Sequence, residues 1–193
     1  MTQYPNWFGE GMAVQYFNQI LGEFIGQPAL MLQIGAYTGD ASEWLLKHVL
    51  TNPESRLVDV DTWKGSDEVA HKNFDWSDVE SFYTKRFESQ LADGKLVKIK
   101  STSSEYFANY DDVYDFIYVD GDHTGIGVLA DGIDAYDCLK VGGILAFDDY
   151  GWNPDNLPRH LTPAPAIDAI REIYTGRLEV IADGYQVWFR KIS

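Results

Sequence analysis

Two stretches decide the predicted fold of this chain: Phe116-Ile-Tyr-Val-Asp120-Gly-Asp122-His123 and, after a helix-like run, Gly142-Gly143-Ile-Leu-Ala-Phe-Asp148-Asp149-Tyr150. Each stretch is an apolar run that ends in acidic residues. A continuous apolar run is typical of a strand that is buried on both faces of a parallel sheet. Because open α/β sheets bind ligands at the carboxyl ends of their strands, we expect an acidic edge there, formed by Asp120, Asp122, Asp148 and Asp149.

The composition predicts one ordinary globular domain over residues 1–193, with 45% hydrophobic and 23% charged residues. A net charge of −15 argues against nucleic acid or an anionic membrane surface as a partner, because both require a basic surface, although a local basic patch stays compatible. The single cysteine, Cys138, excludes an internal disulfide and is expected to be buried and inert. Neither a signal peptide nor a membrane span is evident, so a cytoplasmic location is expected.

The first third of the chain predicts a helix, a strand, a glycine-rich turn and a second helix. Residues 1–27 form a helical cover over a sheet edge or, alternatively, a flap over a ligand. Residues 29–34 read as a buried strand, and the turn Gly35-Ala36-Tyr37-Thr38-Gly39 follows it before a helix begins. Such a turn brings the backbone close to a ligand, and the helix start offers free N–H groups, which favours a nucleotide-like cofactor.

The second predicted strand, residues 56–60, ends in Asp61-Thr62-Trp63. An acid at this position, roughly 20 residues past the glycine turn, predicts an acceptor for the ribose hydroxyls of the cofactor. A solvated turn aspartate is the alternative. Trp63 either packs over an adenine or belongs to the core, and both interpretations stay open.

Residues 64–93 form an insertion that we expect near the acceptor pocket, because long loops in compact domains are often functional. Within it, residues 77–91 predict a helix with Ser77 as N-cap and Glu80 in a capping box. After the strand at 95–100, the hydroxyl cluster at 101–104 includes Ser103, which either binds a base edge or caps a short helix.

The last third predicts a helix over 125–139 with inward Val128, Ile133, Tyr136 and Leu139, a proline-rich loop over 151–166 and a helix over 166–174. Two strands, 178–182 and 186–192, are joined by Asp-Gly, which is a strong signal for an antiparallel hairpin.

Three interpretations of the acidic edge stay open. Converging carboxylates repel one another, and a hard divalent cation such as Mg²⁺ relieves the repulsion. Helix capping explains some of the same acids, and one of them could serve as a metal-free general base. The basic residues near the edge are His123, Arg159 and His160.

Together, residues 35–39, 61–63, 118–124 and 142–150 resemble class I S-adenosylmethionine-dependent methyltransferases. They are most similar to the metal-dependent small-molecule and sugar O-methyltransferases, which include macrocin-type enzymes. The resemblance covers residues 28–192 and implies a Rossmann-like sheet of seven mostly parallel strands, with helices on both faces and an antiparallel last strand.

The resemblance also implies roles for individual residues. Mg²⁺, or another divalent cation, is expected on Asp120, Asp148 and Asp149, and the general base is expected to be Asp122 or His123. The cofactor is expected over the glycine turn, with Asp61, Thr62, Trp63, Ser103 and Asp120 around it. Two positions depart from the family pattern. Gln33 stands where an acid usually holds the cofactor's amino group, and Ala41 replaces a common hydroxyl residue.

The sequence therefore predicts O-methylation of a small hydroxylated acceptor by an S-adenosylmethionine-dependent methyltransferase. A metal-independent enzyme of the same fold and a non-catalytic module that binds a nucleotide-like ligand are the alternatives. A homodimer is compatible with the sequence, which does not identify the acceptor.

Overall fold

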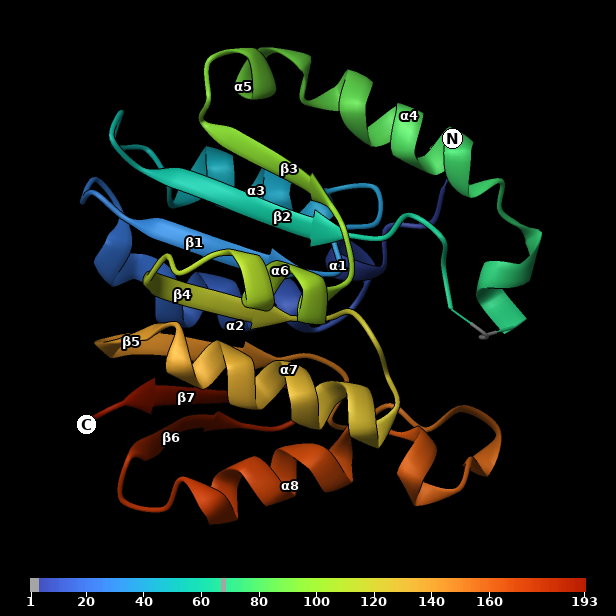
Figure 1. Ribbon diagram of the computed structural model, residues 1–193, viewed down its shortest axis with the longest axis vertical. Coiled ribbons are helices and arrows are strands. Elements are labelled where there is room, and N and C mark those ends of the chain that lie inside the picture. Colours follow the sequence, from blue (N-terminus) through green and yellow to red (C-terminus); the bar gives the residue numbers. More distant parts are fainter. Residues whose placement is uncertain (1–3, 67–68) are drawn as a thin grey trace.

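A computed structural model describes residues 4–66 and 69–193 as one seven-stranded sheet with the strand order β3-β2-β1-β4-β5-β7-β6 (Figure 1). The strands are β1 (Leu30–Ile34), β2 (Arg56–Asp61), β3 (Leu96–Lys100), β4 (Tyr114–Val119), β5 (Leu139–Phe147), β6 (Leu178–Asp183) and β7 (Val187–Lys191). Strands β1 to β5 are parallel, and β7 runs antiparallel to both β5 and β6. This architecture confirms the predicted Rossmann-like fold and the closing hairpin.

Helices cover both faces of the sheet. On one face lie α1 (Trp7–Glu10), α2 (Ala13–Ile20), the 3₁₀ turn η1 (Leu21–Phe24), α3 (Asp40–His48), α4 (Trp76–Arg86) and α5 (Glu88–Ala92), with α4 and α5 along the β3 edge (Figure 1). The 3₁₀ turn η2 (Val69–Asn73) lies beyond the carboxyl ends of the strands (Figure 1). On the other face lie α6 (Ser103–Asn109), α7 (Gly125–Asp137) and α8 (Ala164–Ile173). The loop between β5 and α8 contains two short 3₁₀ turns, η3 (Pro154–Asn156) and η4 (Arg159–Leu161). No helix within the described ranges is long and apolar enough to span a membrane.

The core explains the continuous apolar runs. In β4, Phe116 and Tyr118 face one hydrophobic layer, whereas Ile117 and Val119 face the other. Because alternate side chains of a strand point to opposite faces, a strand covered on both sides must be apolar throughout.

The N-terminal helix corrects one expectation. Phe17 of α2 packs edge-to-face against Phe116, Tyr118 and Trp188. Helix α2 therefore covers the middle of a sheet face, where aromatic side chains of β4 and β7 need a partner, and not a sheet edge.

The start of α4 also differs from the prediction. Its N-cap is Asp75, whose carboxylate accepts hydrogen bonds from the backbone N–H groups of Ser77 and Asp78. Glu80 does not complete a capping box, because its carboxylate pairs with Lys98 and Lys100 of the edge strand. An aspartate two residues before the expected cap satisfies the same helix N–H groups.

Three details further along the chain were also predicted incorrectly. Ile133 of α7 is 38% exposed and does not point inward. Leu139 is buried but begins β5 instead of ending the helix. Cys138 is half-buried and not fully buried.

Candidate active site

The acidic edge forms where β4 and β5 end side by side. Val119 pairs with Phe147, so the residues that follow, Asp120 and Asp148, leave the sheet at the same level. Asp149 comes next and has a φ of +58°. This left-handed conformation is uncommon for a residue with a side chain. Such strained conformations concentrate at functional sites.

Three side chains converge at this edge: Asp120, His123 and Asp149. One ligand atom from each lies within 4.8 Å of the others, and we call this group the Asp–His–Asp cluster. The His123 Nε2 atom lies 3.1 Å from Asp149 Oδ2 and 3.8 Å from Asp120 Oδ1. Tyr185 donates a hydrogen bond of 2.7 Å to Asp149 Oδ1 and fixes that carboxylate from the other side.

The donors of the cluster fit a divalent cation. Burial, and then the carboxylate of Asp148, raise the pKa of Asp120 well above its usual value, while His123 lowers it. A cation would remove the unfavourable interaction between the carboxylates. Two carboxylates suit Mg²⁺, whereas the imidazole also suits a transition metal.

Asp148 lies at the same edge but points to a different partner. Its Oδ2 accepts a hydrogen bond from the Tyr118 hydroxyl, and its Oδ1 accepts one of 2.7 Å from the backbone N–H of Asp149. Tyr118 in turn accepts a hydrogen bond from Gln186 Nε2, whose amide oxygen accepts one from Trp188. The sequence did not reveal this buried relay, since Tyr118 reads as one more member of an apolar strand.

Asp122 lies at the start of α7. It is exposed, and its two oxygens accept hydrogen bonds of 2.8 and 3.0 Å from the backbone N–H and the hydroxyl of Thr124, the N-cap of α7. Of the two predicted bases, His123 is therefore the one inside the cluster.

Two glycines of the turn, Gly35 and Gly39, lie so close to neighbouring atoms that a side chain would clash. Gly35 has a φ of +88°, and a Cβ atom there would lie 2.0 Å from the backbone oxygen of Asp120. Gly39 has a φ of +84°, and its Cβ atom would lie 2.2 Å from the Phe87 ring. Only glycine satisfies both the backbone conformation and the space at these two positions.

Asp61 holds the turn from the neighbouring strand. Its Oδ2 accepts hydrogen bonds from the backbone N–H groups of Ala36 and Tyr37, at 2.9 and 2.8 Å, and its Oδ1 accepts one of 2.6 Å from Trp63. The half-buried Thr62 follows and accepts a bond from the backbone of Lys64.

The Trp63 ring lies in the core and is 2% exposed. Its Nε1 donates to the Tyr37 carbonyl, Lys98 lies 4.6 Å from its centroid, and Tyr83 packs at 5.0 Å. The core alternative therefore describes the Trp63 side chain.

Ser103 is the first residue of α6, and Thr102 caps that helix in a capping box with Glu105, which confirms the expected capping. The Ser103 side chain lies near the buried Asp131 of helix α7, whose pKa burial raises to about 6 and Ser103 lowers.

The 64–93 insertion lies beside the glycine turn. Arg86 donates to the carbonyl of Thr38 at 3.0 Å and to the carboxylates of Asp40 and Glu43 at 2.7 and 2.9 Å. Residues 67 and 68 lie outside the described part of the chain.

An aromatic group covers Tyr37 of the turn. Trp7 stacks on the Tyr37 ring with 4.7 Å between centroids, and Phe74 and Trp76 each pack 6.0 Å from it. Both the N-terminal segment and the insertion thus contact the predicted cofactor turn.

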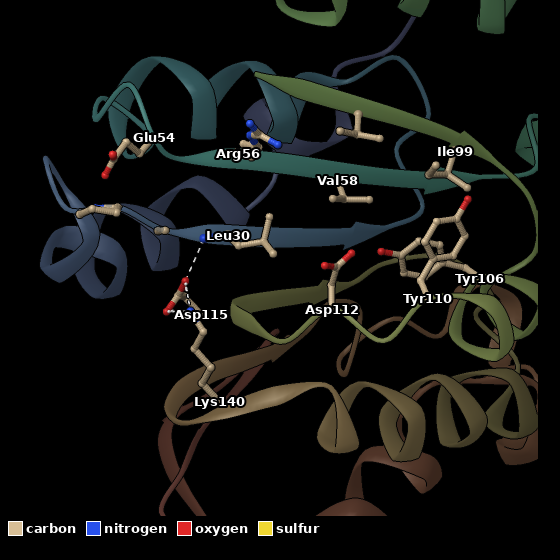
Figure 2. Close-up of a pocket in the computed structure, with 13 residues that line it drawn as sticks. Leu30, Glu54, Arg56, Val58, Ile99, Tyr106, Tyr110, Asp112, Asp115 and Lys140 are labelled. Atoms are coloured by element: carbon tan, nitrogen blue, oxygen red, sulfur yellow. Dashed lines mark hydrogen bonds and ion pairs between the residues drawn. The ribbon is translucent and has the colours of Figure 1, made fainter. Parts of the chain in front are cut away.

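A separate groove of about 410 Å³ opens on the sheet face that carries α6 (Figure 2). Apolar side chains of β1 to β3 form its floor, and Tyr106 of α6 and Tyr110, the residue after that helix, close one end. Asp115 bonds to the backbone of Leu30 and to Lys140 at the other end. The groove contains none of the predicted site residues, so it is distinct from the acidic edge.

Comparisons with known proteins agree with this geometry. The sequence model of a family described as "methyltransferase domain" matches residues 32–150. Among solved structures, a protein described as an rRNA methylase from Clostridium thermocellum is similar, with 14% identity, a TM-score of 0.70 and coverage of 99% of this chain and 98% of that one.

Two O-methyltransferases are also similar. One is from Bacillus cereus in complex with S-adenosylhomocysteine, with 15% identity, a TM-score of 0.64 and coverage of 99% and 84% of the two chains. The other is TomG from Streptomyces achromogenes, involved in tomaymycin synthesis and bound to S-adenosylmethionine, with 16% identity, a TM-score of 0.64 and coverage of 93% and 80%.

Proposed function

Because this chain belongs to the methyltransferase-domain family, we propose that it transfers a methyl group from S-adenosylmethionine to a hydroxyl oxygen of a small acceptor. Family membership confirms the expected S-adenosylmethionine-dependent methyltransferase and sets aside the non-catalytic alternative. The observation that carries the proposed reaction is the convergence of Asp120, His123 and Asp149 within 4.8 Å. The cluster adjoins the glycine turn, because the backbone of Asp120 lies against Gly35.

The cofactor would lie along the glycine turn with its ribose at Asp61. Although three backbone N–H groups already bond to Asp61, a carboxylate offers about four acceptor positions. A ribose hydroxyl can therefore still donate to it. The adenine would lie toward the start of α6, near Ser103, while Trp63 supports the turn from the core.

Asp120, His123 and Asp149 would hold the divalent cation. When bound, such a cation supplies charge stabilisation and lowers the pKa of a hydroxyl group at the site. Three features orient the Asp149 carboxylate: its left-handed backbone, the hydrogen bond from Tyr185, and the hydrogen bond from its own N–H to Asp148. We assign Asp148 to this supporting role, in place of direct metal binding. In this metal-dependent reaction, Asp122 stays the predicted general base, and Thr124 orients its carboxylate.

A metal-independent reaction is the second candidate, and the 3.1 Å contact between His123 Nε2 and Asp149 Oδ2 favours it. In that form the Asp149 carboxylate accepts a hydrogen bond from Nε2–H and fixes the tautomer of His123. The His123–Asp149 pair then takes the proton of the acceptor hydroxyl.

Calorimetric titration with S-adenosylhomocysteine tests the cofactor assignment, and absence of binding at millimolar ligand would refute it. With an acceptor panel, chelator should abolish turnover by the metal-dependent form and leave the second candidate active. Asp149→Ala should remove Mg²⁺ or Mn²⁺ binding measured directly by calorimetry, whereas Asp111→Ala, at an exposed site, serves as the control. Unchanged metal affinity in Asp149→Ala would contradict the assignment.

A further inference from the structure

Asp59 is a buried acid in the middle of β2 that the proposed reaction does not use. Its side chain is 0% exposed. Its Oδ2 atom lies 2.6 Å from the Ser42 hydroxyl of α3 and 2.6 Å from the Tyr83 hydroxyl of α4. One carboxyl group therefore joins a sheet strand to two helices, directly beside the glycine turn.

The neighbouring side chain on β1 is Gln33, and its orientation is fixed. The Gln33 Nε2 atom lies 2.9 Å from the carbonyl oxygen of Gly35, the first residue of the turn. A carbonyl accepts only, so the amide nitrogen must face it. The Gln33 Oε1 atom then faces the Ser42 hydroxyl at 3.1 Å and requires a hydrogen from it.

The hydrogens of this network can be counted. Three oxygen–oxygen contacts need one hydrogen each: Ser42 to Gln33, Ser42 to Asp59, and Tyr83 to Asp59. The two hydroxyl groups carry one hydrogen each, and the amide oxygen carries none. An ionised Asp59 would leave one contact without a hydrogen, whereas a protonated Asp59 supplies the third.

We infer that Asp59 is a protonated positioning residue, which donates to Ser42 so that Ser42 donates to Gln33 and Gln33 holds the glycine turn. The consequence for cofactor affinity rests on the proposed function of that turn. Loss of the proton would redirect the Ser42 hydrogen to the carboxylate and leave the Gln33 oxygen unpaired. Since one hydrogen bond contributes about 1 kcal/mol, cofactor affinity should fall about three- to tenfold.

The surroundings of Asp59 agree with a neutral acid. Burial raises the pKa of Asp59 to about 7, against the lowering effect of its hydrogen bonds with Ser42 and Tyr83, and Asp61 adds a smaller upward effect. Burial also raises the pKa of Tyr83, which therefore stays protonated. Lys98, opposite Asp59 on β3, turns its ammonium group to Glu80 and Thr84 instead.

The test is calorimetric titration of S-adenosylhomocysteine at about pH 6 and about pH 8.5. The wild-type protein should lose about three- to tenfold in affinity over this interval. Asp59→Asn should show no such loss, because an amide nitrogen donates to both neighbours at every pH. Ser42→Ala removes the relay, so its affinity should be low at both pH values. Asp111→Asn, a matched change at an exposed site, should behave as the wild type does.

An Asp59→Asn protein that keeps the wild-type loss of affinity would overturn the inference, as would a wild-type affinity that does not fall. If no variant binds S-adenosylhomocysteine at either pH, the proposed function fails. The inference is then decided by infrared difference spectra. Other raised carboxyl groups, such as Asp120 and Asp131, contribute to the carbonyl region of all three proteins. The wild type and Asp111→Asn should therefore show one protonated-carboxyl band at about pH 6 that Asp59→Asn lacks. A wild-type spectrum identical in this region to that of Asp59→Asn would refute the protonated Asp59.

Discussion

Replacing Asp59 by asparagine should make the stability of this protein less sensitive to pH. The ordinary pKa of an aspartate, 3.8, applies to the unfolded chain, whereas burial raises the pKa of Asp59 to about 7 in the folded chain. Between these two values the unfolded chain releases the proton and the folded chain keeps it. The free energy of unfolding of the wild type therefore falls as the pH rises, and the loss is complete above the folded pKa.

The magnitude follows from this difference in pKa. Each unit corresponds to about 1.4 kcal/mol. From about pH 5 to about pH 8, the unfolded group is already ionised and the folded group becomes so only near the upper end. The wild type should thus lose about 2–3 kcal/mol relative to Asp59→Asn over this interval.

Urea unfolding at the two pH values, followed by circular dichroism, measures this difference. Both proteins carry the same other titrating groups, so their effects cancel in the comparison. Asp111→Asn, at an exposed position, should follow the wild type. An advantage of Asp59→Asn that stays constant between the two pH values would refute the reasoning, because it would show that Asp59 does not change its protonation there.

Three other predictions concern the edge, the turn and the insertion. Tyr118→Phe removes the buried donor to Asp148, so the free energy of unfolding should fall by about 1–3 kcal/mol in urea titrations; an unchanged midpoint would contradict the relay. Gly35→Ala places a Cβ atom 2.0 Å from the Asp120 backbone. Calorimetry should show a loss of about 2–4 kcal/mol in the free energy of unfolding and weaker binding of S-adenosylhomocysteine. Gly94→Ala is the control, because the space around its Cβ position is open. Arg86→Ala breaks two ion pairs of a mostly buried guanidinium and should lower the thermal midpoint, whereas an unchanged midpoint would show that the insertion does not brace the turn.

Much of the architecture was predictable because it depends on local patterns. The apolar runs before Asp120 and Asp148 are long enough to be strands, and a strand buried on two faces tolerates few polar residues. Gly35 and Gly39 both have a left-handed backbone at that turn, which favours glycine, so a glycine pair predicts the turn locally. The Asp-Gly pair before the last strand likewise predicts its hairpin from a few neighbouring residues.

The tertiary structure alone decided which side chains meet. Asp148 and Asp149 are adjacent and chemically identical, yet one bonds to Tyr118 and the other joins His123. A left-handed backbone at Asp149 turns the two carboxylates in different directions, and no local pattern announces that conformation. Asp59 depends on partners from two other elements, Ser42 and Tyr83. The pattern of strands that end in acids therefore predicted one acidic edge, whereas packing between distant segments determined the partner and the protonation of each acid.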